Sequence, residues 1–457
     1  MPFKVFRQMF RSSRLASGQL LVVAAVFSAT SGAAFAQPDY KQLPLNPDLP
    51  TWVKATQSQQ HKDVVDMLSG LQQMNPAKFD SFFNDVLFPF ITQWQDKSVG
   101  RTTVSPLLER YGQDHGPAGI RITIKNTYAN KGSNAAAHEQ LNSIILKFME
   151  PIANDNYHPV VRVNAMLLIA DLNETDPYGA PWKKALPALL KAASDPKTID
   201  GVRDAALRGL VRHAKSGITP ESRGQITTAM LAIIGQHTPP AGRTQDGHDW
   251  ICRRAIDVLA ALGDAGPNGT VPLSLVAIVN DPAASVLIRC AAAEALGTLK
   301  ITAPKDIDAA ALAKSLGRLA IAAVNTELTA KAPLHGPITT GRLNKDFVQI
   351  SHGLTGENGK GGVLTWTTDG TVQGFISLID KALKPLMDAC DKQPLAQPPG
   401  QAAQGSGPVV PVDTQKPIVD ALNTAVEGLK TVLERGEAAS AAAPATPAGK
   451  AAAPDFN

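Results

Sequence analysis

The stretch NYHPVVRVNAMLLIADLN, residues 156–173, has the spacing of apolar side chains expected of an amphipathic helix. Pro159 suits the first turn of a helix, where its missing N–H has no intrahelical partner to lose. The apolar residues recur at i, i+4, i+7 and i+11, which lie on one helical face, and they are Val161, Ala165, Leu168 and Leu172. The stretch therefore predicts one helix of a stack rather than a catalytic loop.

The arginine of this stretch marks a pattern that occurs four times. The segments are VVRVNAMLLIADL (160–172), GVRDAALRGLVRH (201–213), ICRRAIDVLAALG (251–263) and LIRCAAAEALGTL (287–299). A small or aliphatic residue falls at +3, +6 and +7 from the arginine in each segment. The four arginines are Arg162, Arg203, Arg253 and Arg289, and their spacings are 41, 50 and 36 residues. Recurrence at this length is typical of helical solenoids.

The segments before two of these helices also match each other. ALPALLKAASDPKTIDGVR and SLVAIVNDPAASVLIR place Asp-Pro eight residues ahead of the arginine, counted from Asp195 and Asp281. Each unit thus predicts an apolar helix, a turn and the arginine helix. The aspartate either caps the second helix or closes the turn, and the proline ends the first helix.

These residues support a family resemblance. IRCAAAEALG and LGDAGPNGTVPLSLVAIVNDP resemble HEAT repeats, which are armadillo-like helical hairpins, over about residues 139–330 and about four units. Together with the later GLTGENGKGG, the opening stretch also resembles a group of exported bacterial HEAT-like proteins without an assigned activity. The resemblance implies an all-α fold, an α-α superhelix in which stacked hairpins share one core.

The segments that flank the repeats predict two helical caps. Residues 37–138 form the N-terminal cap, within which GIRITIKN (119–126) alternates like a strand. Its phenylalanines either hide the first open face of the stack or line a groove for a partner, and they are Phe79, Phe82, Phe83, Phe88 and Phe90. Residues 331–390 form the C-terminal cap, with two helices separated by a glycine-rich loop and a short extended piece.

The C-terminal part of the chain predicts three further segments. Residues 391–417 have the proline and glycine content of a linker. Residues 418–435 form a short amphipathic helix, because apolar residues recur along one side of it. Residues 436–457 are rich in alanine and proline, and we expect this tail to be disordered.

The first 36 residues predict an export signal. Basic residues precede the apolar run 20–27, and Ala34-Phe35-Ala36 forms a small-x-small cleavage site. An uncleaved N-terminal anchor is the alternative. The apolar run is shorter than the roughly 20 residues that a spanning helix needs, and no later stretch qualifies, so no span is expected after cleavage. We expect a location in the periplasm, the cell envelope or the medium.

Cleavage of the signal changes the net charge of the chain. The precursor has 44 basic and 40 acidic residues, which gives +4. The signal removes four basic and no acidic residues, so the mature chain has 40 of each and a formal net charge of zero. This balance argues against a globally basic protein that binds nucleic acid.

No catalytic, metal or cofactor motif is complete. The glycines around Lys360 lack the Ser or Thr and the preceding strand of a phosphate-binding loop. His248 and Cys252 have i, i+4 spacing without the further soft ligands that zinc needs. His158 suits a cap, and the register of Cys252 and Cys290 argues against a disulfide between them. We therefore predict no cofactor, no metal and no catalytic residue.

One region has an excess of basic residues. Between residues 203 and 254 there are eight basic and four acidic side chains. If several line the concave side of the superhelix, they provide a surface for an anionic ligand such as an envelope polysaccharide. The predicted surface consists of Arg203, Arg208, Arg212, Arg253 and Arg254.

The sequence thus favours a non-catalytic scaffold that binds a protein or polymer in the periplasm or cell envelope. Solenoids present long surfaces suited to such partners. Two alternatives remain open. One is an envelope enzyme, a hydrolase or lyase, with a site in the N-terminal region or in residues 335–372. The other is a structural protein whose tail contacts the cell wall.

Overall fold

The computed structural model describes residues 39–94, 116–129, 134–174, 179–301, 304, 306–329, 340–391 and 412–442. The chain divides into two units, residues 1–41 and 42–457. The predicted signal, most of the predicted linker and residues 443–457 of the predicted tail lie outside the described residues. All that follows concerns the second unit.

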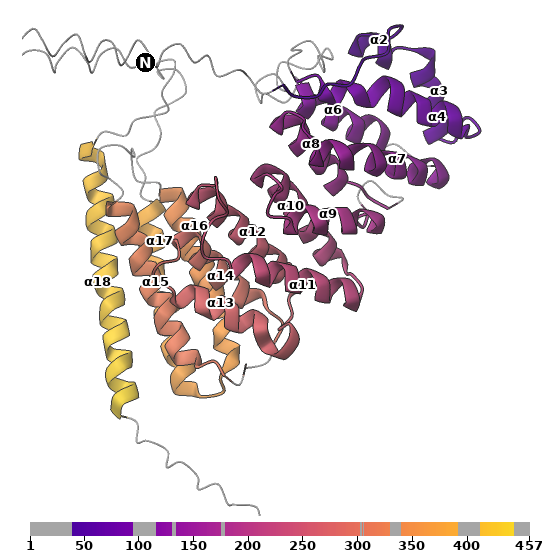
Figure 1. Cartoon of the computed structure of the whole chain (residues 1–457). Coiled ribbons are helices and arrows are strands. Elements are labelled where there is room, and N and C mark those ends of the chain that lie inside the picture. The colour runs from indigo at the N-terminus through magenta and orange to yellow at the C-terminus, as the bar shows by residue number, and fades with distance from the viewer. Residues whose placement is uncertain are drawn as a thin grey trace, which may run out of the picture. The chain divides into compact units, whose positions relative to one another are not determined.

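The described part of the second unit is helical. It holds no strand, and its one β-bridge joins Asn173 to Pro181. The helices pack against one another in the order of the sequence, which confirms the predicted all-α superhelical fold (Figure 1). None of the described helices is both long and apolar enough to cross a membrane.

Four helical hairpins form the centre of the stack. Their first helices are α7 (Ala135–Asn154), α9 (Leu186–Ser194), α11 (Pro220–Ile234) and α13 (Thr270–Asn280). Their second helices, which carry the repeated segments, are α8 (Pro159–Ala170), α10 (Asp200–Ser216), α12 (Gln245–Leu262) and α14 (Val286–Thr298). Each second helix packs on the next, so the four repeated segments lie side by side in one layer.

The repeated arginine joins the two helices of a hairpin. Arg162 Nε donates to the carbonyl oxygen of Ala153 at 3.0 Å, at the end of α7. Arg289 makes the same bond to Val279 at 3.0 Å. The last carbonyls of a helix have no intrahelical partner, so each bond satisfies a group that packing removes from water.

The third hairpin departs from the predicted register by one residue. Cys252, rather than Arg253, takes the place of the arginine, and its Sγ lies 3.7 Å from the carbonyl oxygen of Ile233 at the end of α11. Arg253 instead lies with its Cζ 5.3 Å from the centre of the Trp250 ring. The alignment of Arg253 with the other arginines was therefore wrong.

The Asp-Pro pairs close the turns between helices. Asp195 Oδ1 accepts from the backbone N–H of Lys197 at 2.8 Å, and Asp281 Oδ1 accepts from Ala283 at 2.9 Å. Neither aspartate caps the second helix of its hairpin, which begins five residues later in both units. Of the two roles left open by the sequence, the turn is the one observed.

Where the structure describes it, the N-terminal part consists of helices joined by loops and holds no strand. Its elements are α2 (Trp52–Thr56), α3 (Gln59–Leu68), α4 (Pro76–Ser81), the π-helix η1 (Phe82–Leu87), the 3₁₀ helix η2 (Phe88–Thr92), α6 (Gly116–Thr123) and the π-helix η3 (Ile124–Ala129). All five phenylalanines of the cluster are buried, and the rings of Phe88 and Phe148 lie 5.1 Å apart between this part and α7. The cluster is core and lines no partner groove.

The prediction of a strand at residues 119–126 was wrong. Ile120, Ile124 and Tyr128 are fully buried at i, i+4 and i+8, on one face of the helical segment formed by α6 and η3. Isoleucines two and four residues apart satisfy both a strand period and a helix period. The surrounding helices decide between the two.

The far end of the stack consists of α15 (Ala309–Thr329), α16 (Thr340–Thr355), the turn η6 (Gly362–Trp366) and α17 (Gly370–Asp391). The short extended piece expected here is the helical turn η6. α16 continues the layer of second helices, and its backbone approaches α14 so closely that a Cβ on Gly297 would lie 1.9 Å from the carbonyl oxygen of His352.

The C-terminal helix α18 (Val412–Ala442) is longer than the predicted 418–435. It begins inside the predicted linker and continues through the first seven residues of the predicted tail, where alanine has a high helix propensity. α18 packs on α17 and α15 through Leu422, Leu429 and Leu433, all of which are buried. Residues 412–417 and 436–442 are therefore helical, contrary to the prediction.

Candidate ligand-binding face

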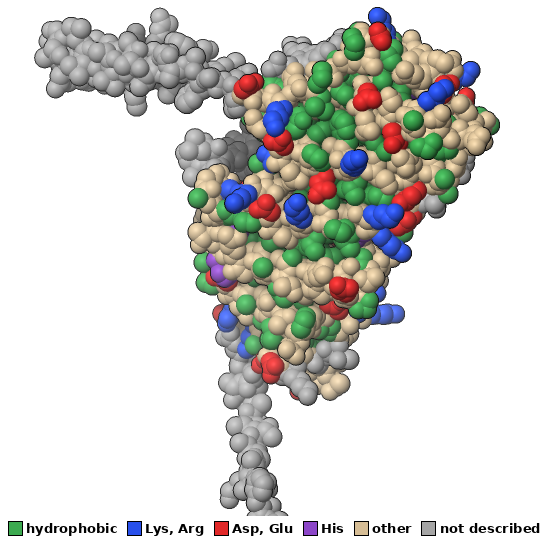
Figure 2. All heavy atoms as spheres, turned by 45° about the vertical axis from the view of Figure 1, so that its right-hand side comes forward, with side chains coloured by type: hydrophobic (Ala, Val, Ile, Leu, Met, Phe, Trp, Pro, Cys, Tyr) green, Lys and Arg blue, Asp and Glu red, His purple; other side chains and the backbone are tan. Residues whose placement is uncertain are grey.

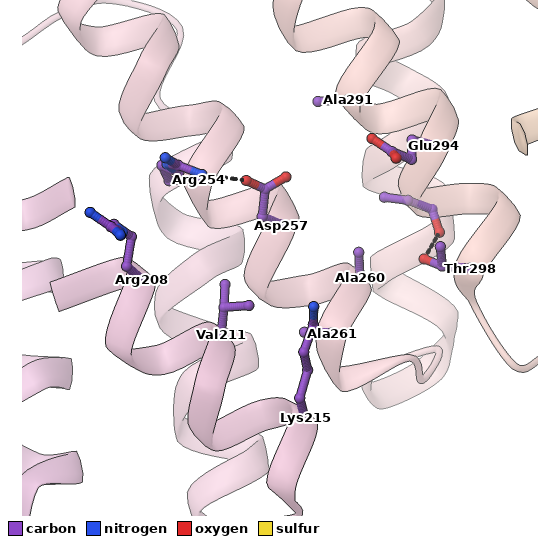
Figure 3. A pocket seen from close by; sticks show the side chains of 11 residues that line it. Arg208, Val211, Lys215, Arg254, Asp257, Ala260, Ala261, Ala291, Glu294 and Thr298 are labelled. Atoms are coloured by element: carbon purple, nitrogen blue, oxygen red, sulfur yellow. Dashed lines mark hydrogen bonds and ion pairs between the residues drawn. The ribbon is translucent and has the colours of Figure 1, made fainter. Parts of the chain in front are cut away.

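The exposed side of the second helices carries an open hollow. It has a volume of about 470 Å³ and spans α10, α12 and α14 (Figure 3). Its floor consists of small side chains, and charged side chains stand around it. The lining residues are Arg208, Val211, Lys215, Arg254, Asp257, Ala260, Ala261, Ala291, Glu294, Ala295 and Thr298. Small residues at successive helix positions thus create the hollow.

Three charged side chains of the hollow occupy equivalent positions of the repeat when Cys252, rather than Arg253, is aligned with the other arginines. Arg208 lies five residues after Arg203, Asp257 five after Cys252, and Glu294 five after Arg289. Five residues correspond to about 140° around a helix, so each of these side chains points away from the hairpin contact. Equivalent positions therefore supply one basic and two acidic side chains.

Arg254 is held on the α12 side of the hollow. Its Nε donates to Asp204 at 2.8 Å and its Nη1 to Asp257 at 3.3 Å. Trp250 supports it, because the Arg254 Cζ lies 4.8 Å from the ring centre and the indole N–H donates to Asp204 at 2.9 Å. Burial raises the pKa of Asp257, and the charges of Arg253 and Arg254 oppose that shift.

The α14 side of the hollow is acidic. Gln349 of α16 donates a hydrogen bond to Glu294, and His352 Nδ1 lies 3.9 Å from the other carboxylate oxygen. Thr298 donates to the carbonyl oxygen of Ala295 at 2.8 Å. Neighbouring groups of the chain thus already engage these side chains.

Two cationic side chains on the α10 side of the hollow are free to pair with a ligand. Arg208 and Lys215 are exposed, and neither side chain makes a hydrogen bond or ion pair with any residue that the structure describes. They lie seven residues apart, which places them about 10 Å apart along α10. An extended ligand with negative charges at that spacing can pair with both.

A smaller hollow of about 180 Å³ lies beside the first, among α6, α8 and α10. Arg208 lines both hollows. The other polar residues of the smaller hollow are Arg121, Asp171 and Arg212.

The five predicted surface arginines do not form one patch. Arg203 is only 3% exposed and donates from Nε to the carbonyl oxygen of Ala193 at 3.0 Å. Arg212 donates to the carbonyl oxygen of Ala170 and to Asn173. Arg253 lies against Trp250, as described above, and Arg254 is paired with carboxylates. Of the five, Arg208 alone makes no hydrogen bond, ion pair or ring contact with a described residue, and Arg253 contacts the Trp250 ring while its buried Nε has no hydrogen-bond partner there.

Sequence reasoning missed Arg121 and Lys125. Both lie in the segment that was read as a strand, and Arg121 lies 87 residues before Arg208. No repeat or motif includes them.

The side view of the molecule in Figure 2 shows basic and acidic side chains interspersed among small hydrophobic areas, without a large region of one charge.

The His248–Cys252 pair is buried and engaged with backbone. His248 Nε2 lies 2.6 Å from the carbonyl oxygen of Gln236 and 3.6 Å from Cys252 Sγ. Burial raises the pKa of the Cys252 thiol to about 12, which disfavours the thiolate that binds metals. Among the described residues no three His, Cys, Asp or Glu side chains are grouped as metal ligands.

The remaining motifs have structural roles. His158 caps α8, because its Nδ1 accepts from the N–H of Val160 at 3.3 Å, and its ring stacks on Trp94 at 4.1 Å. In the glycine-rich loop the N–H of Gly361 donates to the carbonyl oxygen of Thr355 at 2.7 Å. That loop is a turn between helices in which Gly356 and Gly359 adopt positive φ.

Comparison with known proteins adds no family to this description. Neither a protein-family profile nor a curated protein sequence matches the chain.

Proposed function

We propose that the chain is an exported HEAT-repeat protein that binds an extended anionic polymer of the cell envelope and catalyses no reaction on it. The observation that carries the proposal is the open hollow of about 470 Å³ across three successive second helices. Arg208 and Lys215 supply positive charges that no described residue pairs with. The small side chains on the floor of the hollow leave room for a polymer backbone.

Binding of this kind depends on charge and on open space. We expect the protein to bind polygalacturonate, polyglutamate or polyphosphate in preference to neutral dextran, and the affinity to fall with added salt. Fluorescence anisotropy with labelled polymers measures this preference. Equal affinity for dextran and for all the charged polymers would refute the proposal.

Ala261→Trp tests the location of the site. Ala261 lines the hollow, so an indole there fills it without a change of charge. We expect the affinity for the preferred polymer to fall about tenfold or more, because an obstructed contact costs at least about 1.4 kcal/mol. Ala311→Trp is the matched control, since Ala311 is exposed on α15. Equal affinities of the two variants would place the polymer elsewhere.

Export is part of the proposal and is tested separately. The protein recovered from the periplasmic or envelope fraction should begin at Gln37. Mass spectrometry of its N-terminal peptide measures this directly. A chain that keeps residues 1–36 in that fraction would instead support the uncleaved anchor.

A further inference from the structure

The smaller hollow among α6, α8 and α10 gathers cations from separate parts of the chain. Arg121 comes from α6, and Arg208 and Arg212 come from α10. Asp171, the residue after α8, contributes the one acidic side chain among the lining residues. The rest of the lining consists of Leu167, Ala170 and Gly209.

The charges around this hollow do not balance. Lys125 joins the group, because its Nζ lies 3.1 Å from Asp171 Oδ2. Four cationic groups thus surround one carboxylate, which leaves a local charge of +3 among these described residues. Burial lowers the pKa of Arg121, Asp171 opposes that shift, and the charge of Arg208 adds to it. Cations gathered in a partly buried hollow are costly unless an anion joins them.

The guanidinium groups keep donors for a ligand. Arg121 uses Nε for Asn164 at 3.0 Å and Nη1 for Asp171 at 3.2 Å. Arg212 uses Nη1 and Nη2 for the Ala170 carbonyl and the Asn173 side chain. A guanidinium has five N–H donors, so both residues retain some, and Arg208 retains all five.

We propose that this hollow binds a phosphate group. Three guanidiniums on two helices, with Lys125 beside them, present N–H donors to one small volume, and arginine matches the oxygens of phosphate better than a point charge does. A phosphate dianion would offset most of the +3 charge. A carboxylate would offset less and would offer two oxygens where the phosphate offers three or four.

Arg208 connects this site to the larger hollow. A polymer that carries phosphate esters can place one phosphate among Arg121, Arg208 and Arg212 and extend its backbone across α12 toward α14. This second step rests on the proposed function and specifies its ligand as a phosphate-bearing polymer. The binding of phosphate itself does not rest on it.

The test is calorimetric titration of the full protein with inorganic phosphate at low ionic strength and pH 7.5, with acetate titrated in parallel. We expect saturable binding of phosphate and at least about tenfold weaker binding of acetate. Arg208→Ala should weaken phosphate binding about tenfold or more. Lys381→Ala is the control, because Lys381 is exposed on α17 and lines neither hollow, and it should leave phosphate binding unchanged. No saturable phosphate binding, or equal losses in the two variants, would overturn the proposal.

Asp171→Asn gives an independent readout. The amide keeps the shape of the side chain and removes the competing negative charge, so we expect the affinity for phosphate to rise severalfold. A purely structural role of Asp171 predicts a lower affinity or none. A lower affinity in a variant whose circular dichroism is unchanged would contradict the site.

Polymer titrations separate the two proposals and the two sources of phosphate. A phosphate-bearing polymer should bind more tightly than free phosphate and lose that advantage in Ala261→Trp. If free phosphate binds and the phosphate-bearing polymer gains nothing, the small hollow is a site for a soluble phosphate and its connection to the larger hollow fails, whereas the proposed function fails only if no charged polymer binds better than dextran. If polygalacturonate binds in the larger hollow while phosphate does not bind, the proposed function stands and the phosphate site fails.

Discussion

Arg203 Nε donates a hydrogen bond to the carbonyl oxygen of Ala193 at 3.0 Å. The second helix of the hairpin, α10, thus satisfies a carbonyl at the C-terminal end of the first helix, α9. Arg203 is almost fully buried there. Arg208, five residues further along the same helix, is exposed and lines both hollows. Two arginines of one helix thus have opposite roles, and helical position alone separates them.

Removal of the buried arginine should destabilise the fold. Arg203→Met leaves the Ala193 carbonyl without a donor, and an unsatisfied buried polar group costs about 1–3 kcal/mol. Urea unfolding followed by circular dichroism measures the loss. Arg208→Met is the control, and as an exposed position it should change stability by about 0.5 kcal/mol or less. Equal losses in both variants would show that the bond to Ala193 adds nothing.

The cysteines should be unreactive in the native protein. Cys252, Cys290 and Cys390 are buried free thiols, and burial raises the pKa of Cys252 and of Cys390 to about 12 and that of Cys290 as well. A raised pKa lowers the thiolate fraction at pH 8, and the thiolate is the nucleophile. An aromatic disulfide reagent should therefore label none of them until guanidinium is added, and then all three. One rapidly labelled thiol in the folded protein would contradict this arrangement.

Close helix packing should make Gly297 intolerant of a side chain. Gly297→Ala places a Cβ against the backbone of His352, so α14 or α16 must move, and such overpacking costs about 1–3 kcal/mol. Gly374→Ala is the control. Gly374 is a solvent-exposed residue of α17, and no atom lies within 4 Å of the added Cβ. The control should gain up to about 1 kcal/mol from helix propensity. Thermal unfolding of the two variants should shift in opposite directions.

Asp346 should make the stability depend on pH. Burial raises its pKa to about 6, and the charges of Arg342, Arg253 and Lys345 oppose that shift while Glu327 adds to it. A carboxyl that binds its proton more tightly when folded destabilises the fold above the folded pKa. The penalty is complete above about pH 6 and disappears as the pH falls toward about 4. It amounts to about 3 kcal/mol at most.

Asp346→Asn removes that titration. The variant should be more stable than the parent at pH 7.5 and should lose the gain in stability that the parent shows between pH 6 and pH 4. Denaturant unfolding at a series of pH values measures both. Asp420→Asn on the exposed side of α18 is the control and should leave the profile unchanged. An unchanged profile in Asp346→Asn would assign the dependence to another group.

Much of the fold could be predicted from local patterns. The apolar spacing in residues 160–172 and the Asp-Pro turns depend on neighbours within two helices, so the hairpins and their order were predicted correctly. The one-residue shift at Cys252 was not predictable. Arg253 and Arg254 both follow Cys252, and the end of α11 decides which residue faces the Ile233 carbonyl.

The candidate site was predicted only in part. Arg208 and Arg212 were among the predicted residues, whereas Arg203 is buried and Arg121 was not considered.

The sequence by itself determined that the chain forms stacked helical hairpins, because the helix period and the turn residues act over a few residues. The tertiary structure alone decided which arginines are buried and which share a hollow, because burial and charge pairing depend on residues that only packing brings together.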